Sequence, residues 1–89
     1  MQPETRKQVL NRLRRIEGQV RGLALMVEKE TYCIDIMTQS NAVKKALTGV
    51  EDLLLVNHLT THVVEQMKSG KEKKAIEEIA KVYKLASHK

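Results

Sequence analysis

The central part of the chain is residues 32–68, YCIDIMTQSNAVKKALTGVEDLLLVNHLTTHVVEQMK. Helix propensity is good throughout, the stretch contains no Pro, and Gly49 is its only Gly. We therefore expect one long helix, about 54 Å from end to end. Cys33 lies near its start, and His58 and His62 lie near its end.

The spacing of these three residues indicates a site shared by two chains. His58 and His62 are four apart and share one helix face. Cys33 comes 25 residues before His58, which is about 37 Å along a straight helix, too far for one metal ion within one chain. An antiparallel partner helix would close this gap, with the two-fold axis near Ala46 and Leu47. We therefore predict a dimer with two Cys-His-His sites, each built from both chains.

Composition limits the fold and the setting. A chain of 89 residues makes one small domain, residues 1–89, which buries little apolar surface alone. The core must be aliphatic, because Phe and Trp are absent, and this favours helix-on-helix packing. A single Cys excludes internal disulfides and fits a reducing cytoplasm. No apolar run is long enough to span a membrane, and the charged N-terminus does not resemble a signal peptide.

The excess positive charge is confined to one segment. Residues 6–21 hold six Lys or Arg residues and one acidic residue, whereas the rest of the chain has ten of each. A polyanion such as DNA is the partner that this distribution favours. The residues that we expect to contact phosphates are Arg12, Arg14, Arg15 and Arg21, together with Lys44 and Lys45.

Two further helices are predicted on either side of the long one. Apolar residues with a 4-3-4-3-4 spacing indicate a bundle helix over about residues 3–29, with Pro3 in its first turn. Thr31 is the expected N-cap of the second helix, over residues 32–68, and Gly70 the expected C-cap at its end. A shorter helix is expected over 71–86, with His88 frayed. The spaced apolar residues are Val9, Leu13, Ile16, Val20, Leu23 and Val27.

A metal site competes with plainer interpretations of the same residues. A lone Cys on a helix is usually a small buried hydrophobe, and two His four apart are often surface residues. Thiolate with imidazole suits Cu(I), Zn(II), Ni(II) or Co(II). Two imidazoles and one thiolate make a three-coordinate Cu(I) site, whereas tetrahedral Zn(II) needs a fourth ligand. No phosphate-binding loop, paired carboxylates or Ser-His-Asp set is present, so an enzyme is not indicated.

The segment Arg14-Arg15-Ile16-Glu17-Gly18-Gln19-Val20-Arg21-Gly22 resembles the N-terminal signature of the CsoR/RcnR family of bacterial metal-sensing repressors. Cys33, His58 and a ligand at position 62 match that family's ligand spacing, and the resemblance covers essentially the whole chain. It implies an all-α fold, an antiparallel four-helix-bundle dimer that assembles into a tetramer, and operator binding by the metal-free form. It also implies that Tyr32 and Glu78 support the ligands from behind, with a hydrogen bond to His58 fixing its tautomer.

One position departs from the commonest pattern of the copper sensors. His62 stands where many of them have Cys, and nickel and cobalt sensors resemble this chain at all three ligand positions. Those sensors also use an N-terminal His, whereas this chain has Gln2. Formaldehyde sensors carry Pro directly after the initiator Met, whereas here it is Pro3.

We therefore expect a cytoplasmic Cu(I)-responsive repressor of transcription. The alternatives are a nickel/cobalt- or formaldehyde-responsive repressor of the same family, a metal buffer that does not bind DNA, or a helical bundle with an incidental Cys.

Overall fold

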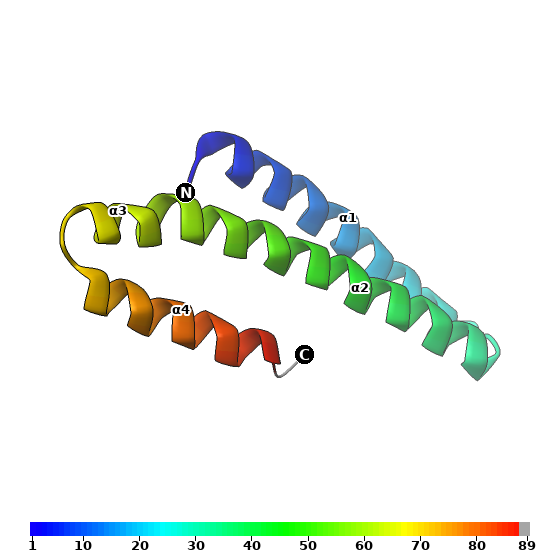
Figure 1. Ribbon diagram of the computed structural model, residues 1–89. Coiled ribbons are helices and arrows are strands. Elements are labelled where there is room, and N and C mark those ends of the chain that lie inside the picture. Colours follow the sequence, from blue (N-terminus) through cyan, green and yellow to red (C-terminus); the bar gives the residue numbers. More distant parts are fainter. Residues whose placement is uncertain (88–89) are drawn as a thin grey trace.

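The computed structural model describes residues 1–87, all of which except the turns and the first two residues are helical (Figure 1). No strand occurs in this range, so the all-α prediction is confirmed. His88 lies outside the described residues. No helix within residues 1–87 has the length and apolar character needed to cross a membrane. The elements are α1 (Pro3–Glu28), α2 (Cys33–His58), η1 (Leu59–Val63), α3 (Val64–Lys68) and α4 (Glu72–Ser87).

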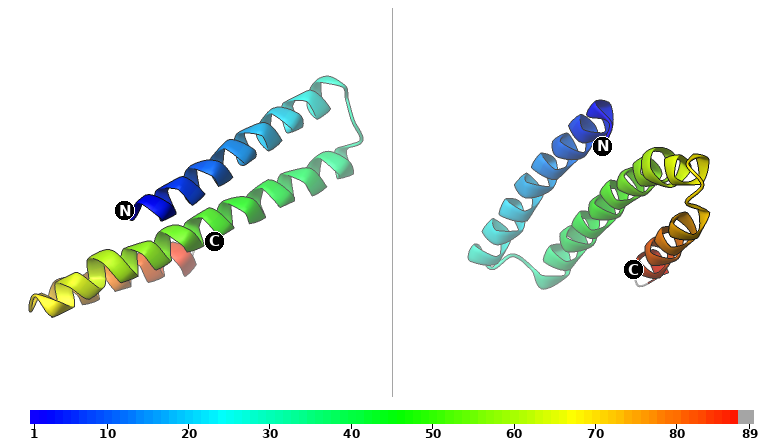
Figure 2. Two further views of the ribbon diagram at one scale, coloured as in Figure 1. Left: turned by 90° about the horizontal axis from the view of Figure 1, so that it is seen from above. Right: turned by 90° about the vertical axis from the view of Figure 1, so that its left-hand side faces the viewer.

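Helices α1 and α2 form an antiparallel hairpin (Figures 1 and 2). Pro3 is the first residue of α1, where its missing N–H costs nothing. Glu30 ends this helix in the left-handed region, at φ 54°, and Thr31 N–H donates to the carbonyl of Met26 at 2.9 Å. The expected N-cap was wrong by one residue: Tyr32 is the N-cap of α2, without a capping side-chain bond.

The long helix predicted over residues 32–68 is continuous but not α-helical throughout. Residues 59–63 form a π-helical turn, η1, between α2 and α3. Thr60 and Thr61 lie in this turn, and their hydroxyls donate to the carbonyls of Val56 and Asn57 at 2.9 and 2.7 Å. Helical segments of this kind are rare and often occur at functional sites.

The core lies between α1 and α2 and is small. Four buried aliphatic residues, Val9, Ile16, Val43 and Val50, form its centre. The predicted apolar seam of α1 is only partly covered, since Val20 and Val27 are 50% and 61% exposed. The chain measures 57 × 27 × 12 Å, so it is about one helix diameter thick.

A tight turn returns the chain along η1 and α3. The expected C-cap was wrong by one residue, because Ser69 is the C-cap of α3. Gly70 follows it at φ 79°, and Lys71 N–H donates to the carbonyl of Gln66 at 2.7 Å. Helix α4 then packs against α3 and η1 and buries Ala75. This packing brings Glu78 beside the end of α2.

Candidate metal centre and nucleic-acid interface

The two predicted histidine ligands lie next to each other. His58 is the last residue of α2, and His62 belongs to η1. Their ring centroids are 5.2 Å apart, with the ring planes inclined by 38°. The His58 side chain is 33% exposed and His62 is exposed, so both rings can be reached from solvent.

Glu78 contacts His58 from behind. Its Oε2 atom lies 2.9 Å from Nε2 of His58. Its other oxygen, Oε1, accepts a hydrogen bond of 3.0 Å from Nε2 of Gln66. The Glu78 side chain is 27% exposed, so both bonds form at the edge of the packed region between α4 and the long helix.

These contacts hold Glu78 in its ionised form. The hydrogen bond from Gln66 lowers the pKa of the Glu78 carboxyl most, followed by the hydrogen bond and electrostatic attraction of His58 and by the charge of Lys74. Partial burial acts in the opposite direction and is outweighed. Glu78 is therefore a carboxylate at neutral pH, and a carboxylate only accepts hydrogen bonds.

This arrangement selects one tautomer of His58. Because Glu78 can only accept, the neutral form of His58 carries its proton on Nε2 and donates it to Glu78, which leaves the lone pair of Nδ1 available to a metal. A ring nitrogen prepared in this way is a metal ligand, and a carboxylate behind it raises its basicity. The donors therefore fit a soft or borderline metal ion.

Cys33 and Tyr32 lie at the opposite end of α2 from the histidines. Both are exposed. Within residues 1–87 of a single chain, no group of three His, Cys, Asp or Glu side chains is placed to hold a metal ion. The structure thus brings His58, His62 and Glu78 together and leaves Cys33 and Tyr32 apart from them.

The predicted DNA contacts are all exposed. They come from α1 and, through Lys44 and Lys45, from the helix packed beside it. Arg12 also lies over α2, where its Nη1 atom would be 3.1 Å from a Cβ at Gly49. Gly49 therefore leaves room for this arginine between the two helices. The other basic side chains in the set are Arg14, Arg15 and Arg21.

Sequence reasoning missed two polar residues at this end of the molecule. Asn57 is 6% exposed, and its Oδ1 accepts a hydrogen bond of 3.2 Å from the main-chain N–H of Gln2, which holds the start of α1 beside His58. Gln66 contacts Glu78. Its position four residues after His62 and eight after His58 was the available signal, because such spacing keeps all three near one line on a helix.

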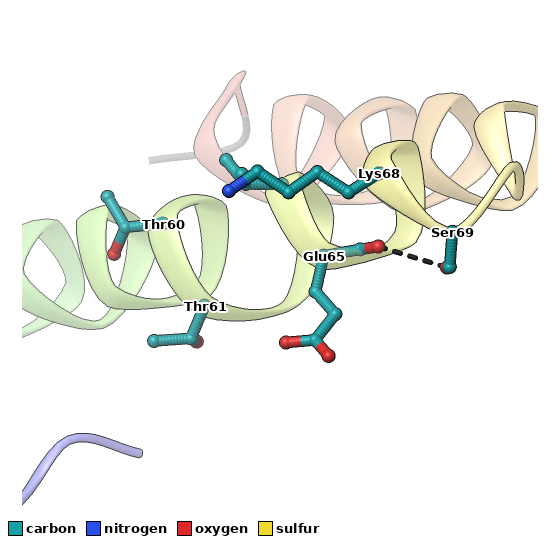
Figure 3. Close-up of a pocket in the computed structure, with 6 residues that line it drawn as sticks. Thr60, Thr61, Glu65, Lys68 and Ser69 are labelled. Carbon is teal, nitrogen blue, oxygen red and sulfur yellow. Dashed lines mark hydrogen bonds between the residues drawn. The ribbon is translucent and has the colours of Figure 1, made fainter.

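A separate open hollow runs along η1 and α3 (Figure 3). None of the predicted ligands lines it. The hydroxyls of Thr60, Thr61 and Ser69 already donate to main-chain carbonyls, which leaves mainly Glu65 and Lys68 for a polar ligand. The hollow therefore does not compete with the histidine pair as the candidate site.

The chain is similar in sequence to known metal-sensing repressors. The sequence profile of the family described as metal-sensitive transcriptional repressor matches residues 5–85. The copper-sensing transcriptional repressor CsoR of Bacillus subtilis is 47% identical over 77 residues, covering 86% of this chain and 76% of that protein. The copper-sensing transcriptional repressor RicR of Mycobacterium tuberculosis is 51% identical over 59 residues, 66% of this chain and 62% of that protein.

A solved structure is similar over nearly the whole chain. The copper-sensing repressor CsoR with Cu(I) from Geobacillus thermodenitrificans superposes with a TM-score of 0.89 at 37% sequence identity. The alignment covers 98% of this chain and 91% of that one.

Proposed function

Because this chain belongs to the family of metal-sensitive transcriptional repressors, which are not enzymes, we propose that it is a Cu(I)-responsive repressor of the cytoplasm. The metal-free protein would bind operator DNA, and Cu(I) would release it. The observation that carries this proposal is the paired rings of His58 and His62, with Glu78 leaving Nδ1 of His58 free.

Copper is favoured over other metals by two observations. The CsoR and RicR proteins compared above are described as copper-sensing. One thiolate and two imidazoles suit Cu(I), which accepts few and soft ligands, whereas Zn(II), Ni(II) and Co(II) prefer more. Cys33 would supply the thiolate, with His58 and His62 as the imidazoles and Tyr32 beside them.

The complete site requires a second chain. Cys33 of one protomer would join His58 and His62 of its partner in an antiparallel four-helix dimer, and dimers would pair into a tetramer. The apolar surface of α2 supports this arrangement. Large apolar side chains along this helix are exposed to water in the single chain, as is typical of a surface that binds another protein chain. These side chains are Ile34, Met37, Leu47, Leu54 and Val56.

The basic surface would bind the operator. Phosphates would be neutralised by Arg12, Arg14, Arg15 and Arg21 on α1 and by Lys44 and Lys45 on α2. Such contacts supply a large share of the affinity of proteins for DNA. The hydrogen bond from Gln2 N–H to Asn57 connects the start of α1 to the residue before His58. A change at the ligands can therefore reach the helix that carries the arginines.

Fluorescence anisotropy with DNA from upstream of the protein's own gene tests the proposal. Under anaerobic conditions the metal-free protein should bind this DNA, and Cu(I) should release it. By thermodynamic reciprocity, DNA should weaken Cu(I) binding by the same factor. Release by Ni(II), Co(II) or formaldehyde but not by Cu(I) would reassign the inducer. Metal binding without any DNA binding would indicate a buffer instead.

A further inference from the structure

Gln66 donates a hydrogen bond to the carboxylate that supports His58, and it is not itself one of the proposed ligands. We propose that Gln66 is a positioning residue of the metal site: it holds Glu78 so that the second carboxylate oxygen points at His58. This inference rests on the proposed function, because it assigns Gln66 a role in preparing a metal ligand.

The two oxygens of Glu78 have different partners. Oε1 accepts from Gln66 at 3.0 Å and Oε2 lies 2.9 Å from His58. A glutamate side chain has several rotatable bonds and loses considerable freedom when it is held in one conformation. A single contact with His58 leaves the carboxylate free to turn about its own axis, whereas a second contact on the other oxygen fixes its plane.

The orientation of the Gln66 amide follows from charge. Its carbonyl oxygen would be repelled by the carboxylate, so the NH₂ group must face Glu78. Oε1 of Gln66 is then buried, and it has no hydrogen-bond partner within residues 1–87. An unpaired buried acceptor is unfavourable, and an apolar side chain here would avoid it. Packing alone therefore does not account for Gln66, whereas the charge-assisted bond to Glu78 does.

The main chain of Gln66 is fixed as well. Its carbonyl accepts the 2.7 Å bond from Lys71 that closes the turn into α4, the helix that carries Glu78. Gln66 thus holds both the turn and the carboxylate that the turn brings back. Lys74 also attracts Glu78, but no hydrogen bond between them directs the carboxylate.

Removing the amide should disturb His58 without removing a ligand. In Gln66→Met, a side chain of similar length keeps the packing but cannot donate to Glu78. Glu78 should then rotate, and His58 should become a mixture of its two neutral tautomers. Cu(I) affinity should fall by less than about 10-fold, below the range usual for a direct partner of a ligand, and DNA release at saturating Cu(I) should become incomplete.

The test is ¹⁵N NMR of the histidine rings in the full-length, metal-free protein without DNA, at mildly alkaline pH. Wild type should show His58 with its proton on Nε2. Gln66→Met and Gln66→Glu, which places a second carboxylate beside Glu78, should both shift the ring signals of His58 towards the other tautomer. Gln19→Met is the matched control, because Gln19 on α1 also has a buried, unpaired Oε1, and it should leave His58 unchanged.

The outcomes separate this proposal from the proposed function. An unchanged His58 tautomer in both Gln66 variants, with helicity intact by circular dichroism, would overturn the positioning role. Should Gln66→Met not fold, Gln66→Glu decides alone. A tautomer shift supports the role even if wild-type DNA binding proves insensitive to Cu(I), a result that would count against the repressor function only.

Discussion

At the scale of single residues, the site depends on which nitrogen of His58 holds a proton. Glu78 is ionised and can only accept a hydrogen bond, so it assigns that proton to Nε2. In the proposed site, a metal bound to Nδ1 of His58 would act on α4 through the other side of the ring.

Replacing Glu78 by Ala should therefore separate sensing from binding. All three ligands remain, so Cu(I) affinity should fall by at most about 10- to 100-fold. The coupling between metal and DNA, usually about 1–3 kcal/mol, should be largely lost, and the copper-loaded variant should stay on DNA. Operator affinity with and without Cu(I) is the measurement. Glu77→Ala, one residue away and exposed, is the control. Full release by Glu78→Ala at saturating Cu(I) would make Glu78 a plain surface charge.

The lowered pKa of Glu78 predicts a pH dependence of stability. Its folded-state pKa lies below the ordinary value of 4.5, so ionised Glu78 favours folding above pH 4.5, and this contribution is lost as pH falls through the folded-state value. Wild type should therefore be more stable than Glu78→Gln at neutral pH, and the difference should shrink below pH 4.5. Urea denaturation midpoints of both proteins, at neutral pH and below pH 4.5, measure this difference in stability. A constant difference would place the effect in packing instead of charge.

At the scale of the elements, two helix ends use the same motif with different residues. Glu30 after α1 and Gly70 after α3 both adopt positive φ, and in each case the next N–H donates to a carbonyl five residues back. This conformation is sterically unfavourable for a residue with a Cβ, whereas Gly adopts it without strain.

Substitutions at these two ends should have opposite effects. Gly70→Ala should destabilise the protein by about 1–2 kcal/mol. Glu30→Gly should be neutral or stabilising by up to about 1 kcal/mol, since it also removes a negative charge from a helix C-terminus.

Gly22→Ala, inside α1 with open space around it, should stabilise the protein by about 1 kcal/mol, because Ala favours the helix more than Gly does. Chemical denaturation measures all three. A loss of stability in Glu30→Gly would show that the Glu30 side chain matters more than its φ.

The helices could be predicted from the sequence because apolar periodicity and the positions of Pro3 and Gly70 are local signals. The π-helical turn could not be predicted from its threonines, because Thr38 and Thr48 make the same bond to a main-chain carbonyl within the regular part of α2. Partners of Asn57 and Gln66 could not be predicted from periodicity. Their bonds depend on where α1 begins and where α4 returns, which is a property of the whole chain.

At the scale of the whole molecule, the proposed ligands lie at the start of α2 and at its end with the adjoining η1, and the basic residues lie on α1 and the middle of α2. Metal binding and DNA binding are therefore separable by mutation, and each has its own test.

Arg14→Ala or Arg15→Ala should weaken DNA binding by the metal-free protein. The slope of log affinity against log salt concentration should also become shallower, by the amount that corresponds to about one phosphate contact for each subunit engaged. Cu(I) affinity without DNA should barely change. Anisotropy titrations at several salt concentrations measure the slope. Lys81→Ala on α4 removes one exposed positive charge outside the segment and is the control. Unchanged slopes in both arginine variants would move the DNA contact elsewhere.

Mixing two defective proteins should restore a metal site. Cys33→Ala keeps both histidines, and the double variant His58→Ala, His62→Ala keeps the thiol. After subunit exchange, each antiparallel heterodimer should contain one intact site, whereas each variant alone should bind Cu(I) poorly. Competition with a Cu(I) chelator measures recovery. No recovery in fully exchanged mixtures would count strongly against the antiparallel arrangement.

The thickness of the chain, 12 Å, limits how much stability a single chain can have. A single layer of helices has two broad faces and a very small core, so the side chains that a second layer would cover are exposed to water. In the proposed dimer, therefore, folding and pairing are a single equilibrium that follows mass action. Dilution alone would unfold such a protein. The number of copies in the cell would then determine both how much operator is occupied and how long each copy escapes proteolysis.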